Sequence, residues 1–361
     1  MGKFGILVGS FAIATTGITP SWAVPPNNIA YVQPATGTDS GTCGAATSPC
    51  ATLNQALANV SSGGNIYVLS GGTFGPIYLT TAVSIHGPPD DSLNIIWSNA
   101  APGCVGAAAG TCAATSNYAV DMEAASSDGF KFRYVIFNNG AGTNGAMKIG
   151  NAFEVKMYGV DLRGGTGSPP QLLLAEPTTA TQFQLLIQKG NIGFSNGVGV
   201  EVAPGAGNAD VTILDSVINN NTGGILLKPA AGGSINAALD HVTIVNNNGG
   251  GIRADSSNGP ITVDISDSVI VDNVANGLNI SSGTGTQNDM VNVIRTTIAK
   301  NGLNGIQTGG SNAAVLLNAS TLDSNTNGAT SASNGARIIS YGNNQIIGPA
   351  GSGFTGTAPL Q

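Results

Sequence analysis

Hydrophobic and polar residues alternate over short stretches in the second half of this chain. The clearest examples are VTILDSVI (211–218), ITVDISDSVI (261–270) and VNVIRTTI (291–298). A period of two in segments rich in β-branched residues predicts β-strands with one buried side, and none of these segments has helical periodicity. The chain is therefore expected to be built from strands.

These strands belong to a repeat marked by a glycine and a following apolar residue. Its six copies are GVEVAP at Gly199, GILLKP at Gly224, GIRADS at Gly251, GLNISS at Gly277, GIQTGG at Gly305 and GATSAS at Gly328. The intervals between the glycines are 25, 27, 26, 28 and 23 residues, which favours strands joined by variable loops over a helical solenoid. We expect glycine at the corners because tight turns require backbone angles that side chains resist.

Asparagine dominates the position four residues before each of these glycines. The column consists of Ser195, Asn220, Asn247, Asn273, Asn301 and Ser324. Stacked coils about 4.8 Å apart place equal positions above one another, so these side chains are expected to form an amide ladder inside the turn. Asparagine here has a structural use.

The first half of the chain fits the same scheme less regularly. Strand-like segments at 65–87, 130–137, 153–162 and 183–194 extend the predicted solenoid back to about Gly64. Before it, Leu53, Ala56, Leu57 and Val60 make one apolar helical face, which predicts a short helix that covers the first coil. We expect an N-terminal segment with this helix at 24–63, an all-β parallel β-helix at 64–348 and a C-terminal tail at 349–361.

These features resemble the right-handed parallel β-helix proteins of the pectin-lyase-like superfamily, especially bacterial exported ones. The resemblance rests on a cysteine-containing segment, the capping helix, the opening GGNIYVLSGGTF and the later asparagine rungs, and it covers roughly Tyr31 to Ile347. It implies a right-handed, single-stranded β-helix. It implies no single activity, because the superfamily includes pectate lyases, polygalacturonases, epimerases, phage tailspikes and adhesins.

The catalytic signatures of these enzymes are mostly missing. The paired carboxylates of polygalacturonases are matched only by Asp90 and Asp91, in a loop after two prolines. The Trp-Ile-Asp-His stretch of pectate lyases is approached only by Leu239-Asp240-His241, where we expect Asp240 to be a turn residue. Neither His86 nor His241 has metal-ligand spacing, so no metal site is expected. A bound calcium ion is expected only if the protein is a lyase.

Composition and charge narrow the range of partners. Of 361 residues, 53 are Gly and only 9% are charged, whereas 41% are hydrophobic, too many for a disordered chain. The net charge of −7 makes a phosphate backbone a poor partner, so no nucleic acid is expected. The expected partner is a polysaccharide or a cell-envelope polymer.

The first 23 residues have the pattern of a signal peptide. Lys3 precedes a mostly apolar run from Phe4 to Ile18, and Ser21-Trp22-Ala23 is a small-x-small cleavage signal. We expect cleavage near Ala23 and a secreted, periplasmic or cell-surface protein. No later segment is long and apolar enough to span a bilayer, so no membrane span is expected in the mature chain.

The four cysteines fall into two close pairs, Cys43 with Cys50 and Cys104 with Cys112. Four cysteines allow three connectivities, and only proximity along the chain favours this one. A zinc site is less favoured because there is no Cys-x-x-Cys spacing and no histidine nearby. Two disulfides are consistent with an oxidising compartment.

Alternation also predicts which side chains leave the solenoid. If the residue after each corner glycine points inward, the next one points outward. The resulting outward column consists of Glu201, Leu226, Arg253, Asn279 and Gln307, and a second column two residues on consists of Ala203, Lys228, Asp255, Ser281 and Gly309. Such a face offers hydrogen bonds for sugar hydroxyls and a bidentate Arg253 for a uronate carboxylate.

A second concentration of basic residues precedes this region. It consists of Lys131, Arg133, Lys148, Lys156 and Arg163, five of the 12 basic residues in the chain. An anionic polysaccharide fits such a segment, although Asp128, Glu154 and Asp161 are interspersed and solubility alone also explains it.

Two functions follow from the sequence. In the first, the exported solenoid binds a polysaccharide or cell-surface polymer without cleaving it, with Asn279, Gln307, Lys131, Arg133 and Lys148 as contact residues. In the second, it is a polysaccharide lyase or a related carbohydrate-active enzyme. The catalytic candidates are then Arg253, Lys228, Glu201 and Asp255. A lyase base requires an Arg or Lys whose pKa is substantially lowered, which the sequence does not reveal.

Overall fold

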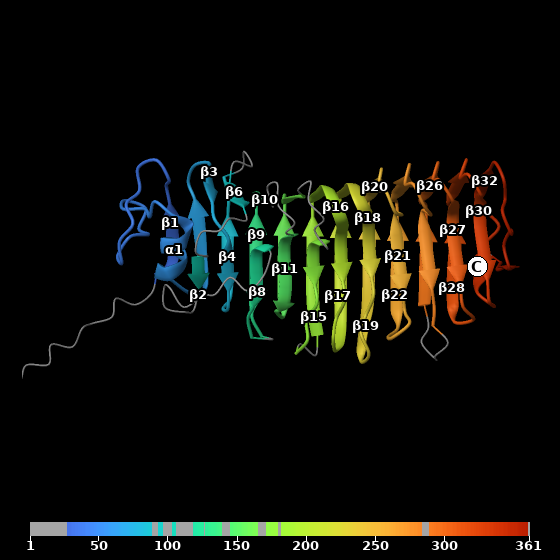
Figure 1. Ribbon diagram of the computed structural model, residues 1–361, viewed down its shortest axis with the longest axis horizontal. Coiled ribbons are helices and arrows are strands. Elements are labelled where there is room, and N and C mark those ends of the chain that lie inside the picture. The colour runs from blue at the N-terminus through green and yellow to red at the C-terminus, as the bar shows by residue number, and fades with distance from the viewer. Residues whose placement is uncertain are drawn as a thin grey trace, which may run out of the picture.

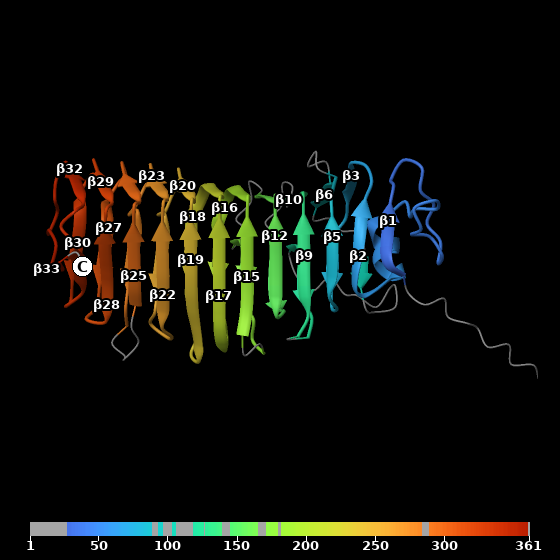
Figure 2. The ribbon, with the colours of Figure 1, turned by 180° about the vertical axis from the view of Figure 1, so that it is seen from behind.

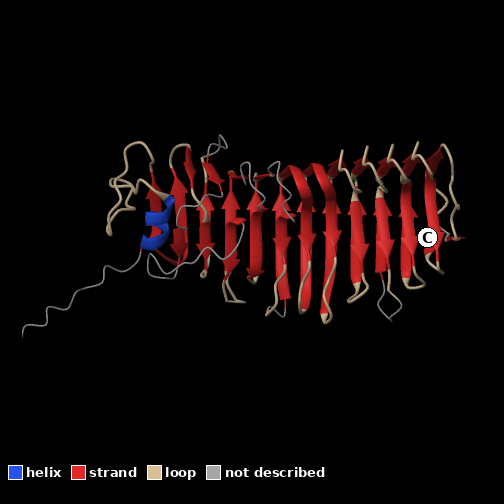
Figure 3. Ribbon diagram, viewed as in Figure 1, coloured by secondary structure: helices blue, strands red, loops and turns tan. Residues whose placement is uncertain are grey.

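The computed structural model describes residues 27–88, 93–96, 103–105, 118–125, 127–138, 145–164, 171–179, 182–283 and 289–359. The chain winds into an elongated rod whose coils follow one another from the N-terminal to the C-terminal end (Figure 1). Nearly every described coil is made of strands, and the described residues contain one helix (Figure 3). The predicted parallel β-helix is confirmed.

One side of the rod is a 13-stranded parallel sheet, called here the first sheet, which faces the viewer in Figure 2. Each strand pairs with the corresponding strand of the next coil, so neighbours in the sheet come from successive turns of the chain. The strands are β1 (Asn27–Val32), β2 (Val60–Val68), β5 (Val83–His86), β9 (Gly129–Arg133), β12 (Glu154–Tyr158), β15 (Gln182–Gln188), β17 (Gly207–Leu214), β19 (Gly233–Asp240), β22 (Ile261–Ser266), β25 (Asp289–Ile294), β28 (Ala313–Asn318), β31 (Arg337–Ser340) and β33 (Gly356–Thr357).

The remaining strands form a 20-stranded sheet that bends into two faces. The short-strand face contains β3 (Gly72–Phe74), β6 (Leu93–Ile96), β10 (Val135–Asn138), β13 (Asp161–Arg163), β20 (Thr243–Val245), β23 (Val269–Val271), β26 (Thr297–Ala299), β29 (Thr321–Asp323) and β32 (Gln345–Ile347). The groove face contains β4 (Ile77–Leu79), β7 (Gly103–Val105), β8 (Tyr118–Glu123), β11 (Gly145–Asn151), β14 (Gln171–Ala175), β21 (Ile252–Asp255), β24 (Leu278–Ser281), β27 (Asn304–Gly309) and β30 (Gly328–Ser333). Two long strands, β16 (Asn191–Val202) and β18 (Val217–Leu227), pass through the corner and join the faces.

The sheet extends beyond the boundaries expected from the sequence. Strand β1 lies before the helix and pairs with β2, so the first sheet begins ahead of Gly64. At the other end, β33 lies within the expected tail and pairs with β31. These two pairings are made by backbone hydrogen bonds, which the pattern of side chains along the sequence does not reveal.

The hydrophobic core is a set of columns inside the rod. In β17, for example, Ala209, Val211 and Ile213 are buried while the residues between them face outward. Burying one such aliphatic side chain contributes about 1.5–3 kcal/mol, and each does so only by stacking on the coils above and below. Register between coils is therefore what creates the core.

An asparagine ladder lines one corner. Its members are Asn221, Asn247, Asn273, Asn301 and Asn325. Each side-chain oxygen after Asn221 accepts the backbone N–H of the preceding member at 3.0–3.2 Å. All five side-chain amides donate to backbone carbonyls, those of Ile192, Ile218, Ile244, Ile270 and Ile298. The ladder satisfies buried backbone groups that the turn removes from the sheet.

Two expected ladder positions, Asn220 and Ser324, are wrong by one residue. Both adopt positive φ, 52° and 49°, and precede the true members Asn221 and Asn325. Counting back from the corner glycine fails there because the loop between ladder and glycine is one residue shorter in these two coils than in the others. The ladder follows the turn geometry and not the distance to the glycine.

A second polar row, not predicted, lies at the corner between the first sheet and the short-strand face. Its members are Ser216, Ser268, Thr296, Ser320 and Asn344. In Ser268, for example, the hydroxyl accepts the N–H of Val242 at 3.1 Å and donates to the carbonyl of Ser266 at 2.7 Å. Serine and threonine are common throughout this chain, so their spacing was not distinctive in the sequence.

The corner glycines are required for a different reason from the one expected. Among the six, only Gly328 has positive φ. A Cβ atom at Gly224 would lie 2.3 Å from the carbonyl oxygen of Gly251, and one at Gly251 would lie 2.5 Å from that of Gly277. Glycine is therefore needed because successive coils approach closely, whereas the left-handed conformations belong mainly to polar residues just before the ladders.

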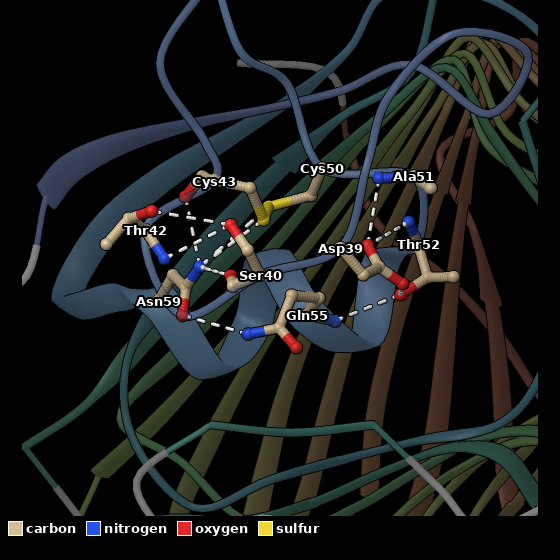
Figure 4. The surroundings of a disulfide bond; sticks show 9 residues. All are labelled: Asp39, Ser40, Thr42, Cys43, Cys50, Ala51, Thr52, Gln55 and Asn59. Atoms are coloured by element: carbon tan, nitrogen blue, oxygen red, sulfur yellow. Dashed lines mark hydrogen bonds between the residues drawn. A yellow bond between two sulfur atoms is a disulfide. The ribbon is translucent and has the colours of Figure 1, made fainter.

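The N-terminal end is closed by α1 (Leu53–Asn59), as predicted. Leu53, Ala56 and Leu57 are buried, and the Thr52 hydroxyl accepts the N–H of Gln55 as an N-cap. Asp39 fixes the start of the helix by accepting hydrogen bonds from the N–H groups of Ala51 and Thr52, both at 2.9 Å (Figure 4). This cap keeps the first coil from presenting an open end to solvent.

A disulfide joins Cys43 to Cys50 beside this helix, with Cα atoms 5.0 Å apart (Figure 4). The side-chain amide of Asn59 donates to the carbonyls of Ser40 and Cys43 and so holds the loop against α1. The expected Cys104–Cys112 bridge lies outside the side chains that the structure describes, as do Asp90, Asp91 and the expected signal peptide. No helix among the described residues is long and apolar enough to cross a membrane.

Candidate functional site

The outward column predicted for the second half lies on the groove face. Backbone pairing places Glu201 next to Leu226, Leu226 next to Arg253, and so on to Asn279 and Gln307. The residues that follow the corner glycines, such as Ile225 and Ile252, are buried, so the alternation was predicted in the correct phase. The side chains form one row along the rod.

A half-open groove of about 310 Å³ lies beside this row. Its lining residues include Val198, Thr222, Gly223, Gly224, Leu226, Gly249, Gly250, Arg253, Ala275, Asn276 and Asn279. Four of these are glycines from the corners of adjacent coils, so part of the lining of the groove is bare backbone, and Ile225 and Ile252 also contribute to it. A volume of this size lies at the lower end of the range typical of small-ligand sites.

Arg253 stands at the rim of the groove, and its side chain is 57% exposed. One terminal nitrogen of its guanidinium donates to Asp255 at 2.9 Å, which leaves most of the N–H groups of this planar donor directed at solvent. Asn279 follows on the next strand, and Asn276 is held by Gln307 and Asn304. The rim therefore presents a fixed cation and amides.

Asp255 was expected on the outward face as an exposed residue, but it is only 7% exposed. Strand β21 ends there, and the carboxylate folds back to accept the backbone N–H of Ser257 at 3.2 Å and its hydroxyl. Burial opposes ionisation, but the hydrogen bonds from Ser257 and the charge of Arg253 outweigh it and lower the pKa of Asp255. The carboxylate positions Arg253 and stays ionised at neutral pH.

The four catalytic candidates do not converge. Glu201 lies two strands from Arg253 and accepts a hydrogen bond from Gln171 at 2.6 Å. Lys228 follows the end of β18 and is exposed, without an acidic partner among the described residues. Only Arg253 and Asp255 contact each other, so the structure does not assemble a general acid and base around Arg253.

Acidic residues converge instead around Lys148, farther toward the N-terminal end of the groove face. Its ammonium lies 3.1 Å from Glu123 and 3.3 Å from Glu176, and Tyr78 and Asp121 occupy the same row. Burial disfavours the charge, but the hydrogen bond that Lys148 donates to Glu123 and the charge of Asp121 raise the pKa of Lys148. A lysine held in its protonated form does not serve as a base.

The five basic residues of 131–163 are not one cluster. Lys131, Arg133 and Lys156 face outward from the first sheet, Lys148 lies on the groove face, and Arg163 pairs with Asp161 on the short-strand face. Sequence proximity misled here because successive strands of one coil point to three different sides of the rod.

The two histidines lie in opposite electrostatic surroundings. Burial lowers the pKa of His86, and the charges of Arg133 and Lys131 lower it further. The hydrogen bond and charge of Asp240, whose carboxylate lies 2.9 Å from the His241 ring, raise the pKa of His241. Asp240, expected to be a turn residue, is the last residue of β19, and the turn residue with a positive φ of 53° is His241.

We therefore expect two separate histidine titrations, one below and one above the ordinary value of 6.5. The chain has only two histidines, so NMR of the imidazole signals across pH 5 to 8 resolves both. His241→Asn, which tolerates positive φ, assigns the higher titration by removing it. Coincident titrations, or the reverse order, would contradict these surroundings.

Asp240, His241 and Asp267 bring three ligand atoms together, but these atoms already have partners. Asp240 accepts from the Ser266 hydroxyl, and Asp267 accepts two hydrogen bonds from Arg295. The hydrogen bond from Arg295 and its charge lower the pKa of Asp267, although slight burial opposes this. The cluster is satisfied as an ion-pair network at the surface.

The glycines that line the groove were not predicted from the sequence. Gly223, Gly249 and Gly250 precede the corner glycines and make two runs, Gly223-Gly224 and Gly249-Gly250-Gly251. A Cβ atom at Gly249 would lie 2.5 Å from the carbonyl oxygen of Thr222. Consecutive glycines in adjacent repeats were the available signal, since one corner glycine suffices for the turn.

No protein-family model matches the sequence, and comparison with curated proteins finds no match. Among solved structures, the crystal structure of pectate lyase Pel9A is similar, with a TM-score of 0.53 and 14% sequence identity. The alignment covers 91% of this chain and 78% of the Pel9A chain. The fold is thus the pectin-lyase-like right-handed β-helix, as the sequence resemblance implied, and at this identity the likeness concerns the fold alone.

Proposed function

We propose that this chain binds a polysaccharide in the groove beside Arg253 without cleaving it. The observation that carries the proposal is the groove of about 310 Å³, lined in part by glycines, with Arg253 at its rim. Bare backbone lets a sugar ring approach closely, Arg253 is suited to a uronate carboxylate, and Asn279 offers both a donor and an acceptor for hydroxyls. The fold itself, shared with a pectate lyase, is compatible with a polysaccharide ligand.

A binding role is favoured over a lyase because the site offers no poised base. Glu201 is engaged by Gln171 and Asp255 by Ser257 and Arg253. Proton abstraction next to a carboxylate needs a basic group with a lowered pKa, whereas the pKa of Lys148 is raised. The polar row is therefore suited to hold a ligand.

Arg253→Ala is expected to weaken binding of polygalacturonate at least about tenfold, because a charge-assisted contact is lost. Isothermal titration calorimetry measures the affinity, and thermal melting checks the fold. Gly223→Val tests the groove itself, since a Cβ atom there meets only Val198 at 3.6 Å, so that a larger side chain fits and fills the hollow. It is expected to lose binding while Arg253 stays in place.

Arg337→Ala removes an exposed arginine on the first sheet and is the matched control. If the wild type, Arg253→Ala and Gly223→Val bind polygalacturonate with equal affinity, the groove is not the binding site. Release of unsaturated products from polygalacturonate or alginate, with or without calcium, would overturn the non-catalytic role and support the lyase alternative.

We also infer that the protein is exported. The Cys43–Cys50 disulfide supports this, because such bonds persist in oxidising compartments. The inference predicts that the mature protein starts near residue 24, which N-terminal sequencing of the secreted or periplasmic material would establish.

A further inference from the structure

The N-terminal half of the first sheet carries exposed apolar and aromatic side chains on its outer face. Ile29 of β1, Tyr67 of β2 and Leu69, which directly follows β2, are 44%, 37% and 46% exposed. Tyr31 pairs in register with Tyr67, so these side chains of two neighbouring strands form one group. We call Ile29, Tyr31, Tyr67 and Leu69 the apolar cluster.

Cationic side chains follow on the next strands of the same face. Lys131 and Arg133 face outward from β9, Lys156 of β12 is in register with Lys131, and the exposed Lys189 directly follows β15. We call these four residues the cation patch. Among the described residues, only Lys156 of the four has an acidic side chain within ion-pair distance, that of Glu154. The patch therefore keeps an excess of positive charge in a chain whose net charge is −7.

The same face changes sign farther along the rod. Strands β17, β19 and β22 present Asp210, Asp240 and Asp264 on their outward positions, and these three strands contain no lysine or arginine. The apolar cluster and the cation patch, by contrast, lie mainly on the five successive strands from β1 to β12, which span about 19 Å (Figure 2). One end of the face is thus apolar and cationic, and the other is acidic.

Aromatic rings connect the apolar cluster to the cation patch. Tyr31 stacks on Tyr67 with ring centroids 5.8 Å apart, Tyr67 stacks on His86 at 4.6 Å, and Arg133 follows His86 in register. The ring of Tyr67 is therefore covered on both of its faces, and the part that remains exposed is its edge. Such a ring is not open to stacking by a nucleobase, which requires a free ring face.

We propose that the apolar cluster and the cation patch form one docking surface for a lipid bilayer with anionic headgroups. The cations of the patch attract the negative surface, and Ile29 and Leu69 enter the boundary between headgroups and acyl chains. Tyrosine is enriched at this depth of a membrane, which suits Tyr31 and Tyr67. The rod docks through its N-terminal half because the aspartates repel the headgroups from the other half.

A bilayer fits both parts of this surface, whereas a dissolved polyanion fits only the cations. Polyphosphate or a nucleic acid supplies negative charges but no apolar phase in which Ile29 and Leu69 are removed from water. The contact is peripheral and involves no membrane-spanning segment. It lies on a different face from the Arg253 groove, so it does not depend on the proposed function.

The charge of the patch is tested by co-sedimentation with vesicles of phosphatidylcholine alone or mixed with phosphatidylglycerol. The protein begins at residue 24, which keeps every described residue and leaves out the apolar run from Phe4 to Ile18. We expect at least about tenfold tighter binding to the mixed vesicles, and weaker binding as salt is added.

Two pairs of substitutions separate the patch from the total charge of the protein. Lys131→Gln with Arg133→Gln should weaken binding to the mixed vesicles at least about tenfold, since each charge near an anionic surface is worth about fivefold. Lys300→Gln with Arg337→Gln removes two exposed cations elsewhere and should change binding less than about twofold.

Ile29→Ser with Leu69→Ser tests the apolar cluster. This variant should bind the mixed vesicles at least about threefold more weakly, because less apolar surface leaves water, and should bind polyphosphate like the wild type. Val274→Ser with Leu303→Ser is the matched control, since Val274 and Leu303 are 60% and 40% exposed elsewhere on the rod. Thermal melting of every variant checks the fold.

Equal affinity of the wild type for neutral and mixed vesicles would overturn the proposal, as would wild-type affinity of Lys131→Gln with Arg133→Gln. Unchanged vesicle binding by Ile29→Ser with Leu69→Ser would show that the surface binds charge alone, which also overturns it. Tighter binding of single-stranded DNA than of mixed vesicles at equal ionic strength would replace the lipid by a nucleic acid. Arg253→Ala should bind the vesicles like the wild type, so failure of the groove as a polysaccharide site is recognised separately.

Discussion

Asn273→Ala is expected to destabilise the protein by about 3–5 kcal/mol. Asn273 is 1% exposed and occupies the middle of the asparagine ladder. Its oxygen accepts the backbone N–H and the amide of Asn247 at 3.1 and 3.0 Å, and its amide donates to the Ile244 carbonyl at 3.2 Å and to Asn301 at 3.0 Å. Truncation leaves several buried polar groups without partners, which costs more than a single lost hydrogen bond.

Substitutions of two further asparagines are expected to cause smaller losses of stability. Asn221 is the first rung, and its side-chain oxygen has no hydrogen-bond partner among the described residues, so Asn221→Ala should cost less than Asn273→Ala. Asn248 follows the ladder residue Asn247 but is exposed, and Asn248→Ala should change stability by less than about 0.5 kcal/mol. Urea denaturation measures all three. Similar losses for Asn273→Ala and Asn248→Ala would contradict a structural role of the ladder.

Asp289→Asn is expected to stabilise the protein above pH 7 and to remove a pH dependence of stability. Asp289 begins β25 inside the rod and is 1% exposed. Burial raises its pKa to about 7, the charge of Asp255 adds to the shift, and the nearby Ser256 hydroxyl opposes it only in part. The folded chain therefore favours the protonated carboxyl.

The direction of the pH effect follows from proton linkage. Between the ordinary carboxyl pKa of 3.8 and about 7, the folded chain holds a proton that the unfolded chain has released, so stability falls as pH rises through this window. The full shift corresponds to about 4 kcal/mol. Asparagine has no such proton, so the variant should melt several degrees above the wild type at pH 8 and lose this advantage near pH 4.

Asp264→Asn is the matched control, because Asp264 is exposed on the outer face of β22. The prediction is tested by the melting temperatures of the wild type, Asp289→Asn and Asp264→Asn between pH 4 and 8. Parallel pH profiles of Asp289→Asn and the wild type would show that the Asp289 carboxyl is ionised in the folded protein.

Arg253 is an outward side chain at the rim of the groove, 57% exposed, and it does not contribute to the core. Substitutions at Arg253 are therefore expected to have little effect on folding, in contrast to Asn273.

The β-helix, the capping helix and the outward row from Glu201 to Gln307 could be predicted from the amino-acid sequence, because a period of two and a repeat of about one coil are local properties. The sequence placed the ladder correctly at Asn247, Asn273 and Asn301 and slipped by one residue where a loop shortens. Which columns meet follows only from the three-dimensional fold. The fold covers Asp255, separates Lys148 from Lys131 and brings His86 beside Arg133, because such contacts depend on how successive coils stack and on which side of the rod each strand faces.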